Sequence, residues 1–171
     1  MDNYIVINGK KAELTKEQLK ALGIEVKKKR NNPFDRVDTG EPYYSIHAYT
    51  LVNEEIDEKG SFDDLQFYYN NYFNDRTFTQ QVVWHQLLYR KLLKYSWDNE
   101  AEDNLEWNWD NTGADEINYH YFIYKTNDGF KVGTAIISKG FNVYFSKYDV
   151  AHRAIADVVK PFMEEHPEFE W

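Results

Sequence analysis

The chain has 171 residues, a net charge of −9 and no cysteine. A chain of this length can bury enough apolar surface to fold without disulfides or a structural metal. The missing cysteines exclude disulfide bonds, thiolate zinc sites and cysteine nucleophiles. Because nucleic-acid binders need a basic field to displace phosphate counterions, the negative charge also disfavours direct binding to nucleic acid.

Residues 1–24 predict a small N-terminal hairpin-helix lobe. Asn8-Gly9 joins two short β-prone runs, which is a strong hairpin signal. Thr15 and Gln18 then form a capping box, so a helix should begin at this point. Residues 25–42 are charged and carry prolines and a glycine, which predicts a linker.

Residues 43–96 predict a hairpin followed by a helix. The stretch 43–52 is β-branched and aromatic and predicts a strand, and 65–73 predicts the strand that returns after an acidic turn over 53–64. From Thr77 to about Ser96, apolar residues recur at helical spacing, which indicates an amphipathic helix.

Residues 117–171 predict a second hairpin and helix. Strands over 117–126 and 130–137 flank the turn signal Asn127-Asp128-Gly129. A third strand is predicted over 141–145, after Gly140.

The second helix should run from about Asp149 to Glu165, although Pro161 should kink it or end it early. Apolar residues on one face of each predicted helix should be buried. The positions that we expect in the core are Val83, Leu87, Ile155, Val159 and Phe162.

The two hairpin-helix units resemble each other. Tyr72-Phe73 matches Tyr144-Phe145 at an offset of 72 residues, and Tyr44 matches Tyr121 at an offset of 77. The pattern indicates an internal repeat. We therefore expect an α+β fold with an antiparallel sheet from two related hairpin-helix units, plus the N-terminal lobe.

Residues 97–116 form an acidic, tryptophan-rich segment between the two units. One interpretation is an interface, in which tryptophans anchor a partner and carboxylates steer its approach. The other is a connector whose tryptophans fold back into the core. The interface interpretation makes seven residues the candidate partner-binding site: Glu100, Glu102, Asp103, Glu106, Trp107, Trp109 and Asp110.

No catalytic motif appears in the sequence. The five histidines form no H-x-x-x-H or H-E-x-x-H pair, and there is no nucleophile elbow or phosphate-binding glycine loop. Asp57, Asp63 and Asp64 near Gly60 lack calcium-loop spacing, so we expect a solvated acidic turn. We assign no catalytic residue, no metal and no cofactor.

The start of the sequence carries no basic segment followed by an apolar run, and no stretch approaches 18 apolar residues. We therefore expect a cytoplasmic protein with no membrane partner.

Three stretches carry a resemblance to known proteins: VINGKKAELTKEQLKAL at the start, NPFDRV and GEPYYSI before the first unit, and YFIY with VYFSKYDVAHRAI in the second. With these the chain resembles uncharacterised accessory proteins of phages and prophages in low-GC Gram-positive bacteria. The resemblance implies a host-cell cytoplasmic location and a place among small accessory genes, some of which antagonise host defence.

The first functional hypothesis is a non-catalytic, phage-encoded protein that binds and inhibits a host defence factor. Its acidic surface would mimic nucleic acid and occupy the groove of a basic nucleic-acid-binding effector, such as a CRISPR effector. One alternative is a small metal-dependent hydrolase or nuclease that uses carboxylates or histidines. Another is a phage structural or self-assembly protein, and a homodimer also stays open.

Overall fold

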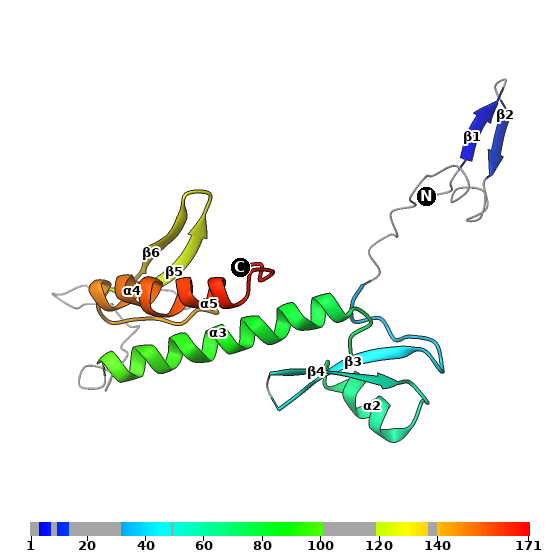
Figure 1. The fold of residues 1–171 in the computed structure, drawn as a ribbon, viewed down its shortest axis with the longest axis horizontal. Coiled ribbons are helices and arrows are strands. Elements are labelled where there is room, and N and C mark those ends of the chain that lie inside the picture. The colour runs from blue at the N-terminus through cyan, green and yellow to red at the C-terminus, as the bar shows by residue number, and fades with distance from the viewer. Residues whose placement is uncertain (1–3, 8–9, 14–31, 49, 101–118, 137–139) are drawn as a thin grey trace. The chain divides into compact units, whose positions relative to one another are not determined.

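The computed structural model describes residues 4–7, 10–13, 32–48, 50–100, 119–136 and 140–171 (Figure 1). Contacts divide the chain into two compact units, Met1–Asp35 and Arg36–Trp171. In the first unit, β1 (Tyr4–Ile7) pairs antiparallel with β2 (Lys10–Glu13). The predicted turn at Asn8-Gly9 and the helix expected from Thr15 lie outside the described residues.

In the compact unit Arg36–Trp171, the turn of the first hairpin comes earlier in the chain than the sequence predicted. Strand β3 (Pro42–His47) pairs antiparallel with β4 (Leu51–Ile56), with Tyr44 opposite Glu54. Ala48 takes a positive φ of 46°, and the Thr50 N–H donates to the His47 carbonyl at 3.2 Å. The strand predicted over 43–52 therefore ends after His47. Strand β4 occupies the first residues of the segment 53–64, which was predicted to be an acidic turn.

The returning strand predicted over 65–73 is wrong, because helix α2 spans Ser61–Tyr68. The Asp63 carboxylate accepts the N–H groups of Glu58 and Gly60, both at 3.0 Å. A carboxylate at this position satisfies donors that a helix start leaves unpaired. This cap outweighs the strand preference of the aromatic residues that follow.

Helix α3 (Arg76–Glu100) confirms the helix predicted from Thr77 and extends it past Ser96, so the first residues of the predicted connector are helical. Asp75 begins it by accepting the Phe78 N–H at 3.0 Å. The helix contacts β3 and β4, and also α4 and the π-helical turn that follows α4 (Figure 1). Within the described residues, no helix is both long and apolar enough to cross a bilayer.

The second hairpin is confirmed. Strand β5 (His120–Thr126) pairs antiparallel with β6 (Gly129–Ala135), and Gly129 takes the positive φ of 115° that the turn requires. The third strand predicted over 141–145 is wrong, since only Phe145 pairs with the hairpin. The Gly140 N–H donates instead to the Tyr144 hydroxyl at 2.6 Å.

The two hairpins carry the same backbone bridge. Tyr44 and Phe73 exchange N–H···O bonds of 2.7 and 2.9 Å, and Tyr121 and Phe145 exchange two bonds of 2.8 Å. A helix begins three residues after each bridge, α3 at Arg76 and α4 at Tyr148. The residues matched by internal similarity, Tyr44 with Tyr121 and Phe73 with Phe145, therefore occupy equivalent positions in the two hairpins.

The α+β class is confirmed, with helices and antiparallel strands in the described residues. The hairpins do not join in one sheet, however. Among those residues the strands form separate two-stranded sheets, β1-β2, β3-β4 and β5-β6. The bridges at Phe73 and Phe145 each add a single residue pair to their hairpin and form no third strand.

The sequence predicted that Pro161 would kink the last helix or end it early, but the helix continues past this residue. Helix α4 (Tyr148–Ala154) passes into a π-helical turn (Ile155–Val159) and then into α5 (Lys160–Glu165). Proline lacks an N–H, and its ring crowds the carbonyl four residues earlier. A π turn widens the helix locally and absorbs such a mismatch.

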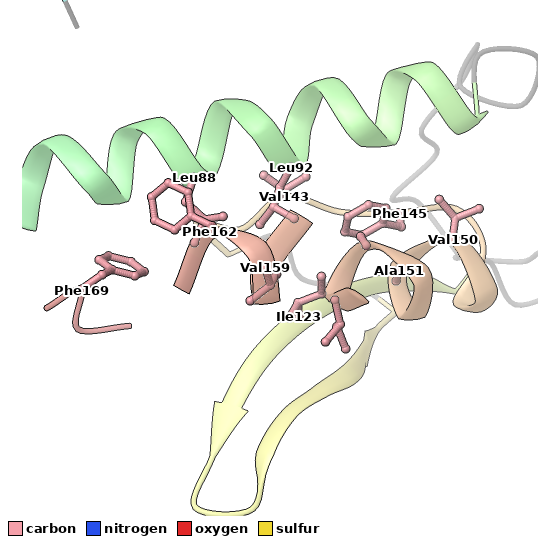
Figure 2. Close-up of a cluster of buried hydrophobic side chains, with 12 residues drawn as sticks. Leu88, Leu92, Ile123, Val143, Phe145, Val150, Ala151, Val159, Phe162 and Phe169 are labelled. Carbon is pink, nitrogen blue, oxygen red and sulfur yellow. The ribbon is translucent and has the colours of Figure 1, made fainter. Parts of the chain in front are cut away.

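The main core lies between α3, β5 and the last helices (Figure 2). Val83, Ile155, Val159 and Phe162 are buried, as predicted. Leu87 is only half-buried at the edge of the cluster, and its neighbour Leu88 takes the core position. The reason is that the buried stripe runs from Val83 through Leu88 and Leu92, with spacings of five and four residues.

This packing predicts that Leu88→Ala destabilises the protein by about 2–5 kcal/mol, because truncation leaves a cavity in the core. The matched control is Leu93→Ala, whose side chain is 39% exposed on the same helix. That change should cost about 1 kcal/mol or less. Urea denaturation measures both, and equal losses would contradict the orientation of α3.

Candidate binding surface

The acidic segment predicted as the binding site falls largely outside the described residues. Glu102, Asp103, Glu106, Trp107, Trp109 and Asp110 lie there, and Glu100 ends α3 with a side chain that the structure does not describe. Trp97 is described, and 56% of it is exposed on α3. This tryptophan therefore does not fold back into the core.

A different feature organises the first hairpin: the carboxylate of Asp57 is fully buried. Arg36 binds it through two nitrogens, Nε to Oδ2 at 2.7 Å and Nη2 to Oδ1 at 3.0 Å. The Tyr72 hydroxyl donates to Oδ2 at 2.8 Å, and the Lys59 N–H donates to Oδ1 at 2.7 Å. A buried charge is tolerated when it is paired and hydrogen-bonded in this way.

A second buried carboxylate, Asp63, lies beside this pair. The Tyr43 hydroxyl donates to it at 3.0 Å, and the Tyr43 ring stacks on Tyr72 with centroids 4.1 Å apart. Arg36 also reaches α2, because Nη1 binds Asp64 at 2.6 Å and the guanidinium lies 5.6 Å from the Phe67 ring centroid. These contacts join β3, β4 and α2 through one polar core.

The network shifts the titration of its members. Hydrogen bonds from Arg36, assisted by Tyr72 and the Lys59 N–H, hold the pKa of Asp57 well below its usual range, against the opposing effect of burial. Burial and the neighbouring Asp57 raise the pKa of Tyr72 to about 12. Burial and the bond to Asp63 likewise raise the pKa of Tyr43.

The expected solvated acidic turn is therefore wrong for Asp57 and Asp63, which face inward. The reason is Arg36, a cation that comes from outside the turn and pairs with both Asp57 and Asp64. Within the described residues, no group of three or more histidine or carboxylate side chains is placed to hold a metal ion.

Helix α2 buries the Asp63 carboxylate in the polar core and exposes its large apolar side chains. Phe67 is 39% exposed, although its ring contacts Arg36 and Tyr72. On a helix with 3.6 residues per turn, Leu65 and Tyr68 lie opposite Asp63, and Phe62 lies to one side of it. Phe62, Leu65 and Tyr68 are 48%, 53% and 76% exposed, and Tyr69 just beyond the helix is 71% exposed. We call these four residues the α2 outer face. Its amphipathicity is the reverse of an ordinary surface helix.

Negative charge surrounds this face in the sequence. From Arg36 to Arg76, both included, there are nine acidic residues and three lysines or arginines. Most of this negative charge lies at the surface, because six of the nine acidic residues are exposed: Asp38, Glu41, Glu54, Glu58, Asp64 and Asp75. The first hairpin-helix unit therefore combines exposed aromatic surface with a negative potential.

The sequence contains a helical signal for this surface. Phe62, Leu65 and Tyr69 have the i, i+3, i+7 spacing of a helix face. Their β-prone composition favoured a strand instead, and the partner of Asp57 lies 21 residues upstream, where periodicity carries no information.

Comparisons with known proteins give no family. No protein-family model matches the chain, and neither a curated protein nor a solved structure does. Function must therefore be inferred from the chemistry of the chain's own residues.

The Asp57 pair predicts acid sensitivity. The pKa of Asp57 is lower in the folded protein than in the unfolded chain, where it is about 3.9. The ionised carboxylate therefore stabilises the fold fully at pH values above about 3.9, and this contribution is lost as the pH falls through the folded-state pKa. Asp57→Asn should cost about 3 kcal/mol at pH 7, because it breaks a buried pair. It should also reduce the further loss of stability between pH 5 and pH 3.

Urea denaturation at pH 7, 5 and 3 measures both effects. Asp38→Asn, at an exposed carboxylate, is the control and should stay within about 0.5 kcal/mol of the wild type at pH 7. An Asp57 variant with wild-type stability at pH 7 would show that the pair does not hold this unit together.

Proposed function

We propose that this protein is a non-catalytic binding protein and that the α2 outer face contacts its partner. The observation that carries the proposal is the reversed amphipathicity of α2, which buries a carboxylate and exposes Phe62, Leu65 and Tyr68. Exposed aromatic clusters of this kind mark interaction sites, because removing apolar surface from water on binding is favourable in free energy.

Charge defines the kind of partner. The six exposed carboxylates of this unit would steer a basic surface toward the α2 outer face, and the aromatic side chains would then supply desolvated contact. A basic protein with apolar residues at the centre of its interface fits both requirements.

A narrower form of the proposal is an inhibitor of host defence, encoded by a phage, that occupies the nucleic-acid groove of a basic effector. The net charge of −9 and the resemblance to phage accessory proteins support this form. The segment over 101–118 would add negative charge to such a surface.

The proposal predicts that a doubly substituted protein, Leu65→Ser with Tyr68→Ser, loses its partner while it stays folded. The test compares proteins captured from a bacterial lysate at low and at high salt, followed by binding kinetics with the captured protein. Because interface aromatics act as anchors, affinity should fall at least tenfold. High salt should slow association, since steering between charged surfaces is screened.

Tyr148→Ser is the matched control, because Tyr148 is 54% exposed in the other hairpin-helix unit. It should bind as the wild type does. If the double variant captures the same proteins with wild-type affinity, the α2 outer face is not the binding surface.

A further inference from the structure

A pocket opens where α3 meets residues of the second hairpin-helix unit, and none of the described residues that line it belongs to α2. It has a volume of about 370 Å³. Its base consists of core residues, among them Leu88, Leu92 and Val143, which Figure 2 shows together in the buried cluster. Tyr89 and Phe141, both exposed, contribute to its rim.

Among the described residues that line this pocket, no side chain is a carboxylate, a lysine or an arginine. An ionised ligand would lose its hydration there without gaining a charged partner, which is costly. The polar groups at the pocket include the imidazole of His85 and the amide of Asn142. Partial burial lowers the pKa of His85, against the opposing effect of a hydrogen bond with the Glu170 backbone, and this favours the uncharged imidazole. This chemistry selects a neutral ligand with a hydrogen-bonding group.

The rim indicates the shape of the ligand. Phe141 is 98% exposed, and its ring is tilted by only 23° from that of Tyr89, with centroids 6.1 Å apart. A second hollow of about 370 Å³ shares Tyr89, Phe141 and His85 with the first, and Gln86 and Arg90 also line it. The Phe141 ring thus offers a flat face beside the uncharged side chains of the first pocket, and planar aromatic groups stack favourably on such a face.

We propose that this pocket binds a small, uncharged, planar aromatic molecule that stacks on Phe141 and directs a polar group toward His85. The volume lies at the small end of the range for ligand pockets, which is about 300–1,000 Å³. The pocket shares no residue with the α2 outer face, so this inference does not rest on the proposed function.

The test uses three probes of similar size: 2-naphthol, the charged naphthalene-2-sulfonate, and the saturated, non-planar decahydro-2-naphthol. Each is titrated into the full chain, isotopically labelled, while amide chemical shifts are recorded. We expect 2-naphthol to give saturable shifts near His85, Tyr89 and Asn142, with Kd on the order of 0.1–1 mM. The charged and the non-planar probes should bind at least fivefold more weakly.

Phe141→Ala removes the stacking face and should weaken 2-naphthol binding about five- to tenfold. The substitution is at an exposed side chain, and circular dichroism verifies that the variant is folded. Tyr148→Ala is the matched control and should leave the Kd unchanged. No saturable shifts with 2-naphthol, equal binding of the sulfonate, or an unchanged Kd in the Phe141 variant would each overturn the proposal.

A tryptophan-containing peptide serves as a further arm. If the peptide shifts the same amides and 2-naphthol does not, the pocket receives a side chain of a protein partner, and the small-molecule proposal is wrong. If both bind and compete, the aromatic selectivity of the pocket is supported.

Discussion

The burial of one carboxylate, that of Asp57, constrains the first hairpin-helix unit. A charge removed from water must be compensated locally. Compensation comes from Arg36 in the segment before β3, from Tyr72 between α2 and α3, and from the Lys59 N–H in the loop before α2. One carboxylate therefore fixes three segments that are distant in sequence.

The orientation of α2 follows from this constraint. Asp63 must face the polar core to cap the helix and accept the Tyr43 hydroxyl. Phe67 lies on the same side of the helix and contacts Arg36 and Tyr72, although it is 39% exposed. A helix of eight residues has only about two turns, so once Asp63 faces the polar core the residues away from it lie on the solvent-exposed side. Because those residues include Phe62, Leu65 and Tyr68, the unit presents aromatic surface. The apolar core that α3 forms with the second hairpin-helix unit borders a pocket instead.

Sequence reasoning found what depends on local signals. The Asn127-Asp128-Gly129 turn, the helix from Thr77 and the matched bridges at Phe73 and Phe145 follow from turn chemistry, periodicity and internal similarity. These features gave the α+β class. The position of Leu88 rather than Leu87 in the core depends on a one-residue rotation of the helix, which periodicity does not resolve.

What the sequence missed depends on contacts between distant residues. Arg36 was assigned to a linker, yet it is the counter-ion of Asp57. Without that partner, the aspartates near Gly60 looked like a solvated turn, and the aromatic run after them looked like a strand. The pocket was missed for the same reason, since Phe141, Tyr89 and His85 come from two separate segments.

The reactivity of the tyrosines tests the orientation of α2 most directly. Nitration with tetranitromethane, followed by mass spectrometry of the peptides, measures the accessibility of each tyrosine in the folded protein. Tyr68 and Tyr69, which are 76% and 71% exposed, should react rapidly, and the buried Tyr43 and Tyr72 should be protected until the protein unfolds. Nitration of Tyr43 or Tyr72 at the rate of Tyr68 would contradict the buried network and, with it, the outward aromatic face.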